Sequence, residues 1–405
     1  GEQKAAIPSI VMQRERLLEY DIVRAITRTA STKKTKIGVL SSIPVFGSPG
    51  MPMMGMPPSP KQVFISELER DFEVVRVSSS STKIDDEVKV LLVIHPKGLS
   101  ETTEFAIDQF ILRGGKVIAL LDSYAYFDLI PTPQGMQPGG SSSNLERLTK
   151  AWGVTFETEK MLADLQFMTG KGNRALPTLL TLNETAYSPT DIATAQLGEV
   201  LLAFTGAFTS SLTPGLKQVD LIKSSGYSEL VSKEIAMEKG EQLGTMIKPS
   251  GQSYPIAIRL EGQFKTAFPD GMPKSAANES ASKSPVVKAD ASKGPASKET
   301  DVAAPVSEVL TQSKENNAVI LIADSDFIND NVAVQIQEIF GQRIVYPTNG
   351  NLAFLQSLVD QFAGDAALVS LRARQSTSYP FTVIREMETR AQQAYVGKIK
   401  ALEEN

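Results

Sequence analysis

The chain has 405 residues, 41% of them hydrophobic, and a formal net charge of −5. Its length is sufficient for two or three domains with a substantial core, and its acidic balance argues against a nucleic-acid partner. There is no cysteine and a single histidine, His95, which excludes disulfides, cysteine nucleophiles and multi-histidine zinc sites.

The first part of the chain predicts alternating strands and helices. Residues 12–30 carry apolar side chains at helical spacing and predict a leading helix within a separate segment, 1–35. Beyond it, strands are expected at 36–42, 72–78, 88–96 and 116–122, with a further strand starting at 154, and helices at about 60–70, 100–113 (capped by Ser100) and 141–153.

The third of these strands, VKVLLVIHP, is almost continuously apolar, which is typical of a parallel strand that is covered on both faces. The alternation predicts an α/β domain over 36–157. We expect a doubly wound, mostly parallel, flavodoxin-like sheet, with a topological switch point between the first and third strands.

The rest of the chain divides into four predicted segments. Residues 158–270 are β-rich without clear helices and predict an inserted subdomain, whereas 271–305 are rich in Ala, Ser, Lys and Pro and predict a disordered linker. The α/β pattern returns over 306–379, with strands at 318–327 and 367–374 and a helix at 351–364. Residues 380–405 predict a charged helix that leads toward a membrane span absent from this sequence.

A loop rich in methionine follows the first strand. Its sequence, PVFGSPGMPMMGMPPSP (44–60), contains Met51, Met53, Met54 and Met56, and we expect it to lie near His95 at the switch point. Thioethers and one imidazole are soft ligands suited to Cu(I). Alternatively, the methionines contact a partner protein or form a lid.

Carboxylates end two of the predicted strands. Asp122, Asp324 and Asp326 are expected to line the ligand crevice, where they would bind a hard cation or a sugar hydroxyl, or else cap the helices that follow. Ser123 and Ser325 are possible partners of His95, but neither lies in a G-x-S-x-G turn. We therefore predict no catalytic residue, and the absence of a phosphate-binding loop excludes a transporter ATPase.

One stretch has a recognisable pattern. VLLVIHPKGLSETTEFAIDQFILRGGKVIALLDS (90–123) resembles the soluble portion of GldG-like auxiliary components of gliding-motility ABC transporters. Further similar stretches are EYDIVRAI (19–26), IAIRLEGQFKTAF (256–268), VILIADSDFIND (319–330), LAFLQSLVDQFAGDAALVSLRAR (352–374) and PFTVIREMETRAQQAY (380–395).

The resemblance implies a fold related to class I amidotransferase domains and to a domain of intraflagellar transport proteins. It also implies a periplasmic, membrane-associated protein that is not an enzyme and has no cofactor. It would act through protein or envelope contacts, with permease and ATPase subunits as partners and homo-oligomerisation left open. The alternative function is a small-ligand or Cu(I)-binding module that delivers cargo to a permease.

Overall fold

The computed structural model describes most of the chain. The described residues are 34–50, 58–132, 135–194, 197–273, 309–339 and 342–363, together with Ile22 and Ile26. Several predictions fall elsewhere: nearly all of the leading helix, the four methionines of the loop, most of the linker, the strand at 367–374 and the charged terminal helix lie outside the described residues.

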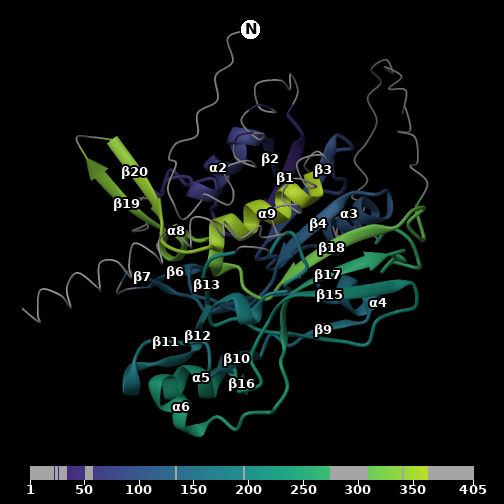
Figure 1. Cartoon of the computed structure of the whole chain (residues 1–405). Helices are drawn as coiled ribbons and strands as arrows, with labels where there is room; N and C mark the ends of the chain where they lie inside the picture. The colour runs from purple at the N-terminus through teal and green to yellow at the C-terminus, as the bar shows by residue number, and fades with distance from the viewer. Residues whose placement is uncertain are drawn as a thin grey trace, which may run out of the picture.

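A mixed sheet of seven strands forms the centre of the molecule, in the order β15-β17-β18-β4-β3-β1-β2 (Figure 1). The five strands from β18 to β2 are mutually parallel, and β17 and β15 continue the sheet antiparallel. Their bounds are β1 (Lys36–Ser41), β2 (Glu73–Val77), β3 (Val88–Ile94), β4 (Lys116–Leu120), β15 (Leu216–Lys223), β17 (Pro255–Gly262) and β18 (Asn317–Ile322).

Continuous burial of the central strands shows that both faces of the sheet are covered. Six of the seven residues of β3 are buried, and successive side chains of a strand point to opposite faces. Helix α9 (Asn351–Ala363) packs against β3 and β4 (Figure 1), and α3 (Glu101–Leu112) packs against β4 and β18. Within the described residues, no helix combines the length and the apolar content that a bilayer crossing requires.

Local chemistry fixes both ends of α3. The Ser100 hydroxyl accepts a hydrogen bond from the Thr103 backbone N–H at 3.2 Å, as the sequence predicts for an N-cap. Gly114 follows the helix with a φ of +100°, a conformation that ends the helix and favours glycine. The Asn317 amide of β18 donates to the carbonyls of Ile111 and Gly115 at 2.7 and 2.8 Å, which ties the end of α3 to the sheet.

The five parallel strands lie in the spatial order β2-β1-β3-β4-β18, which is 2-1-3-4-5 in chain order. The flavodoxin-like arrangement of the sheet stays a proposal. Two strands differ from the prediction: β15 and β17 fall within 158–270 yet belong to the large sheet rather than to a separate subdomain. The pairing of β17 with β18 depends on backbone hydrogen bonds between segments far apart in the sequence, so the composition of 158–270 could not predict it.

The rest of the 158–270 segment forms small sheets, and the strand expected at 154 pairs within one of them. This segment also contains two helices, α5 and α6, that the sequence did not predict. Each is shorter than two turns, which is too short to show a helical pattern of apolar residues. The bounds are β9 (Val154–Phe156) with β14 (Phe208–Ser210); β10 (Lys160–Asp164) with β16 (Ser228–Ser232); β11 (Met168–Thr169), β12 (Leu176–Leu182) and β13 (Val200–Ala203); and α5 (Lys233–Lys239) and α6 (Leu243–Met246).

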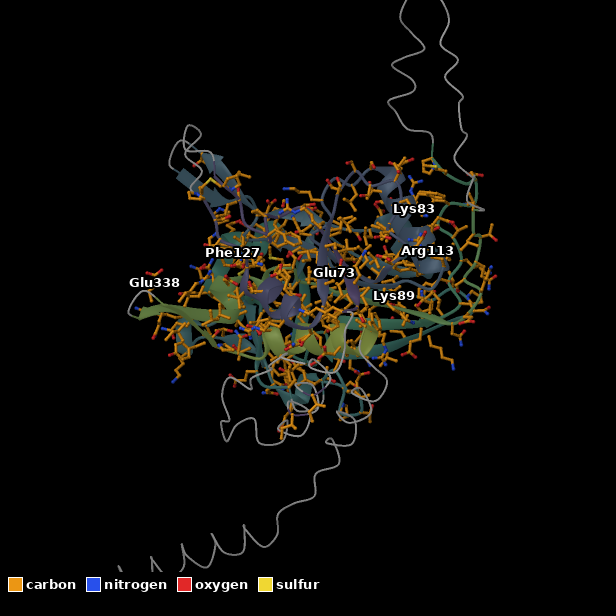
Figure 2. All side chains as sticks on the ribbon, turned by 90° about the horizontal axis from the view of Figure 1, so that it is seen from above. Glu73, Lys83, Lys89, Arg113, Phe127 and Glu338 are labelled. Carbon is orange, nitrogen blue, oxygen red and sulfur yellow. The ribbon has the colours of Figure 1, made fainter. Side chains whose placement is uncertain are left out.

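Two hairpins that the sequence did not reveal extend from one end of the molecule: β6–β7 and β19–β20. Phe127, which precedes the first hairpin, and Glu338 on the second lie toward one end, away from Lys83 and Arg113 (Figure 2). The remaining bounds are α2 (Val63–Asp71), α4 (Glu146–Trp152), α8 (Asp330–Ala333), β5 (Asp122–Ala125), β6 (Leu129–Thr132), β7 (Gly135–Pro138), β8 (Ser141–Ser143), β19 (Val334–Ile339) and β20 (Gln342–Pro347).

The N-cap of α3 gives a direct test of this fold. Ser100→Ala removes the acceptor for the Thr103 N–H, and we expect the free energy of unfolding to fall by about 1 kcal/mol. Urea denaturation measures the change. Ser100→Asp is the matched control, because a carboxylate retains the cap, and equal losses in both variants would contradict this role of the hydroxyl.

Candidate functional site

Three carboxylates lie together where β4 and β18 end. Asp122 begins β5, two residues beyond β4, and Asp324 and Asp326 follow β18; their exposed fractions are 0%, 0% and 1%. Ser325 joins the two segments, because its backbone N–H and its hydroxyl both donate to Asp122 Oδ2, at 2.9 and 2.6 Å. The structure thus brings together the acidic residues that the sequence placed at strand ends.

The oxygens of Asp324 and Asp326 accept hydrogen bonds from neighbouring and from distant backbone. Asp324 accepts from the N–H groups of Asp326 and Phe327 at 2.7 and 2.9 Å through Oδ1, and from Ala203 N–H at 2.7 Å through Oδ2. Asp326 accepts from Tyr126 N–H at 2.6 Å and Phe127 N–H at 3.3 Å. These carboxylates therefore connect three chain segments.

Asp122 completes the same pattern. Its Oδ1 accepts from Tyr124 N–H at 2.8 Å, while Oδ2 accepts from Ser325. Every carboxylate oxygen of the cluster consequently has a protein donor. Only Asp324 caps the short helix that follows it, whereas Asp122 and Asp326 bond the backbone of β5 and of the loop after it. Because every oxygen is buried and already accepts from the protein, the arrangement favours a structural role over an open ligand site.

Burial dominates the electrostatics of the cluster. Desolvation raises the pKa of Asp122 to about 6, against the opposing effect of its hydrogen bonds. The pKa values of Asp324 and Asp326 are raised well above their usual range, first by burial and then by repulsion from the neighbouring carboxylates. Because the three groups repel one another, the ionisation of each depends on the charge of the other two.

The two serines proposed as partners of His95 do not contact it. The Ser123 hydroxyl donates to the Phe204 carbonyl at 3.0 Å, and the Ser325 hydroxyl donates to Asp122. Both serines are fully buried. Their hydroxyls therefore hold loops together.

His95 instead meets residues that the sequence did not suggest. Its Nε2 lies 3.0 Å from the Ser141 hydroxyl, which donates to Asp128 Oδ2 at 2.5 Å, and Asp128 also pairs with Lys97. The histidine is fully buried, and its backbone has a φ of +47°. No sequence signal joins these positions, because Asp128 and Ser141 reach His95 only through the folding of β6, β7 and β8.

The geometry of this group differs from that of a catalytic triad. The carboxylate of Asp128 bonds the serine, and it lies 3.6 Å from His95 Nε2 rather than on the Nδ1 side. Among the residues that the structure describes, the buried Nδ1 has no hydrogen-bond partner. Burial lowers the pKa of His95 to about 4, which outweighs the attraction of Asp128 and keeps the imidazole neutral near pH 7.

The metal hypothesis receives no support from the described part of the chain. No group of three or more His, Cys, Asp or Glu side chains there is arranged to hold a metal ion. Met51, Met53, Met54 and Met56 lie outside the described residues, so the copper version of the alternative function stays a prediction.

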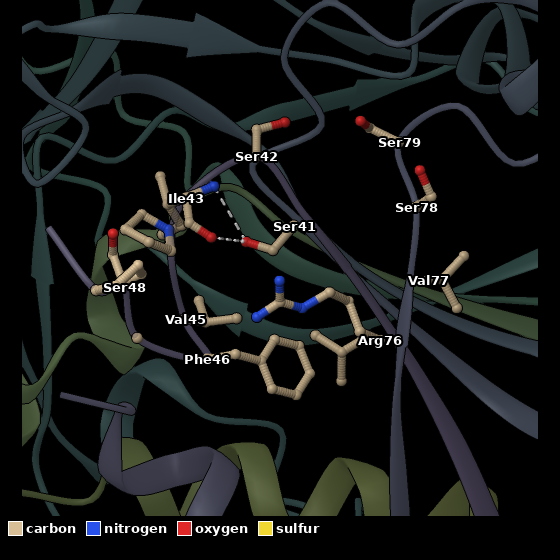
Figure 3. Close-up of a pocket in the computed structure, with 14 residues that line it drawn as sticks. Ser41, Ser42, Ile43, Val45, Phe46, Ser48, Arg76, Val77, Ser78 and Ser79 are labelled. Carbon is tan, nitrogen blue, oxygen red and sulfur yellow. Dashed lines mark hydrogen bonds between the residues drawn. The ribbon is translucent and has the colours of Figure 1, made fainter. Parts of the chain in front are cut away.

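The base of the methionine loop is ordered and borders a pocket. Ser48 and Ser59 exchange two backbone hydrogen bonds of 2.9 Å, which bring the two ends of the loop together. Gly47 has a φ of +82°, and a side chain there would approach the Ser59 carbonyl to 2.7 Å. The pocket beside it is lined by residues 39, 41–49 and 76–79 (Figure 3), and His95 is not among them.

Comparison with known families decides the membership of the chain. A family model, ABC_transp_aux, described as "ABC-type uncharacterized transport system", matches residues 34–357, from the start of the large sheet into α9. The chain belongs to this family. It is therefore an auxiliary component associated with ABC transport, in agreement with the coarser part of the resemblance seen in the sequence. Among curated proteins, none matches the chain significantly.

The buried Asp122 predicts a dependence of stability on pH. Its pKa is about 6 in the folded protein and near 3.8 when unperturbed, so between these values the folded state keeps a proton that the unfolded chain has lost. Through this group, the free energy of unfolding falls as the pH rises from about 4 to about 6. Asp122→Asn removes this titration together with the repulsion of Asp324 and Asp326 by Asp122, so wild type should lose stability relative to the variant over that range.

Urea denaturation of both proteins across this pH range measures the difference. His95 acts with the opposite sign, because its lowered pKa makes stability fall as the pH drops from about 6.5 to about 4. Since both proteins contain His95, its effect cancels in the comparison. A difference in stability that stays constant with pH would show that Asp122 ionises normally.

Proposed function

We propose that this chain is a non-catalytic, GldG-like auxiliary domain that acts on the extracytoplasmic face of the inner membrane through contacts with other proteins or with envelope components. Its partners would be the permease and ATPase subunits of one ABC transport system. Family membership supports the auxiliary role. The finer assignment rests on the resemblance of residues 90–123 and the stretches that accompany it.

One observation carries the non-catalytic part of the proposal. The groups most suited to chemistry at the carboxyl edge of the sheet are committed to structure: the oxygens of the three aspartates accept protein donors, and both neighbouring serines bond within the protein. A nucleophile requires a base within hydrogen-bond reach and a free path to substrate. Ser123 bonds a backbone carbonyl and not a base, and Ser325 has Asp122 within reach but is fully buried, so it has no free path to substrate.

The two hairpins support a role in contacts. Leu129 and Ile130 on β6, and Ile336 and Tyr346 on the β19–β20 hairpin, are exposed. Each hairpin is a two-stranded sheet separate from the large one, and such a hairpin is marginally stable on its own in water. Exposed apolar side chains on projecting hairpins are well placed to be covered by another protein.

A panel of ester and amide substrates tests the absence of catalysis. We expect the purified protein to show no turnover above the buffer rate, because Ser141, His95 and Asp128 are not connected in the order of a catalytic triad. Turnover that Ser141→Ala or Ser123→Ala abolishes would refute the proposal. The circular dichroism spectrum of each variant controls for its folding.

Crosslinking in native membranes tests the contact role. Capture of the protein, read by mass spectrometry, should recover an ATPase and a permease. Replacing Met51, Met53, Met54 and Met56 by serine should reduce the recovery, because it removes the apolar side chains proposed to contact the partner. The substitutions do not touch the Ser48–Ser59 hydrogen bonds at the base of the loop. Met272→Ser is the control, because Met272 is exposed elsewhere on the protein. Recovery of neither subunit would contradict the proposed partners.

A second candidate function is a small-ligand module that serves the same transporter. The pocket beside β1 and β2 favours it, because a ligand crevice in a sheet of this kind lies at the carboxyl ends of the parallel strands.

A further inference from the structure

A pocket of about 570 Å³ lies at the carboxyl ends of β1 and β2. One side is formed by the end of β1 and the loop that follows it, and the other by the end of β2 with Ser78 and Ser79 (Figure 3). The volume falls within the range of sites that bind small molecules. Ser42 also bonds Lys97 just beyond β3, so the loops after β1 and β3 are fastened to each other at this edge.

The charge in the lining of the pocket is positive. Arg76 of β2 is the only charged residue in the described lining, and no carboxylate lines it. Its guanidinium lies 4.7 Å from the centre of the Phe46 ring and extends toward Val45 and Ser41 (Figure 3). Stacking on an aromatic ring holds a guanidinium in place while leaving its N–H groups free to donate.

Arg76 differs from other cations of the same region. Lys36 is paired with Asp85 and Glu87, Arg70 with Glu67, and Arg113 with Asp86. Within the part of the chain that the structure describes, Arg76 has no ion pair and no hydrogen bond to a carboxylate. A stacked but unpaired guanidinium facing a pocket is ready to bind an anion with two parallel hydrogen bonds.

Further donors and an apolar wall complete the pocket. The Ser48 hydroxyl accepts from Gly50 N–H at 3.2 Å and keeps its own proton available, and the Ser79 hydroxyl has no partner among the described residues. The apolar wall consists of Val39, Ile43, Val45, Phe46 and Val77. An oxyanion would satisfy the donors, and an organic body would cover the wall.

We propose that this pocket binds a small organic molecule that carries a carboxylate or phosphate group, with the oxyanion held by Arg76. This inference names the ligand class of the second candidate function and rests on that candidate. It is independent of the contact role, which the crosslinking experiment tests separately.

Ligand-observed NMR titration of the full chain tests the proposal with matched probes. Phenyl phosphate and benzoate share an aromatic body and differ in the oxyanion, benzyl alcohol is the neutral analogue, and inorganic phosphate lacks the body. We expect saturable binding of one or both aromatic oxyanions, at least about tenfold tighter than that of benzyl alcohol. The preferred oxyanion then distinguishes phosphate ligands from carboxylate ligands.

Substitutions at Arg76 locate the site. Arg76→Gln should weaken binding at least about tenfold, and Arg76→Lys should weaken it less, because lysine keeps the charge but loses the bidentate geometry. Arg147→Gln is the matched control: Arg147 also stacks on an aromatic ring, Phe268, but it is paired with Glu101 and Glu104 outside the pocket. Arg76 is exposed, so its variants should retain wild-type thermal stability.

Two outcomes would overturn the proposal. The first is the absence of saturable binding by every oxyanion tested. The second is binding that Arg76→Gln leaves unchanged or that Arg147→Gln weakens as strongly, since either result would place the anion elsewhere on the protein.

Discussion

The fold depends on three buried carboxylates that supply hydrogen-bond acceptors where strands leave the sheet. Beyond β4 and β18 the regular ladder ends, and the backbone N–H groups of Ala203, Tyr124 and Tyr126 need acceptors inside the protein. Asp122, Asp324 and Asp326 supply them. Burying these carboxylates is unfavourable, as their raised pKa values show, and the hydrogen bonds offset part of this effect.

The same constraint explains how a strand from late in the chain enters the sheet. β18 lies parallel to β4 although about two hundred residues separate them, and Ser325 bonds Asp122 across the junction. Asp324 reaches Ala203 at the end of β13, so the segment between β4 and β18 is fixed at the same point. The carboxyl edge, which in many α/β proteins is open to ligands, is in this part closed by its own side chains.

The sequence predicted features that depend on local pattern. The buried run of β3, the Ser100 cap and the acidic residues at strand ends follow from periodicity and short spacing. It did not predict that β15 and β17 extend the large sheet, or that Ser141 and Asp128 meet His95, because these contacts join distant segments. Arg76 was also missed, since one arginine on an edge strand resembles ordinary surface charge until Phe46 is placed beside it.

The carboxyl edge of the large sheet has two parts that differ in character. The carboxylates near β4 and β18 are buried and bonded within the protein, whereas the part near β1 and β2 contains a pocket with a free cation in the described lining. This division is consistent with membership of a family of auxiliary components of ABC transport.

The central claim is that the carboxylates near β4 and β18 are sealed inside the protein. Carbon-13 NMR titration of the aspartate carboxyl groups, assigned with single Asp→Asn variants, measures their pKa values directly. The account predicts that Asp122 titrates near pH 6, with Asp324 and Asp326 also displaced upward from the ordinary range. Ordinary values of about 3.9 for all three groups would show that water reaches them and would contradict the account.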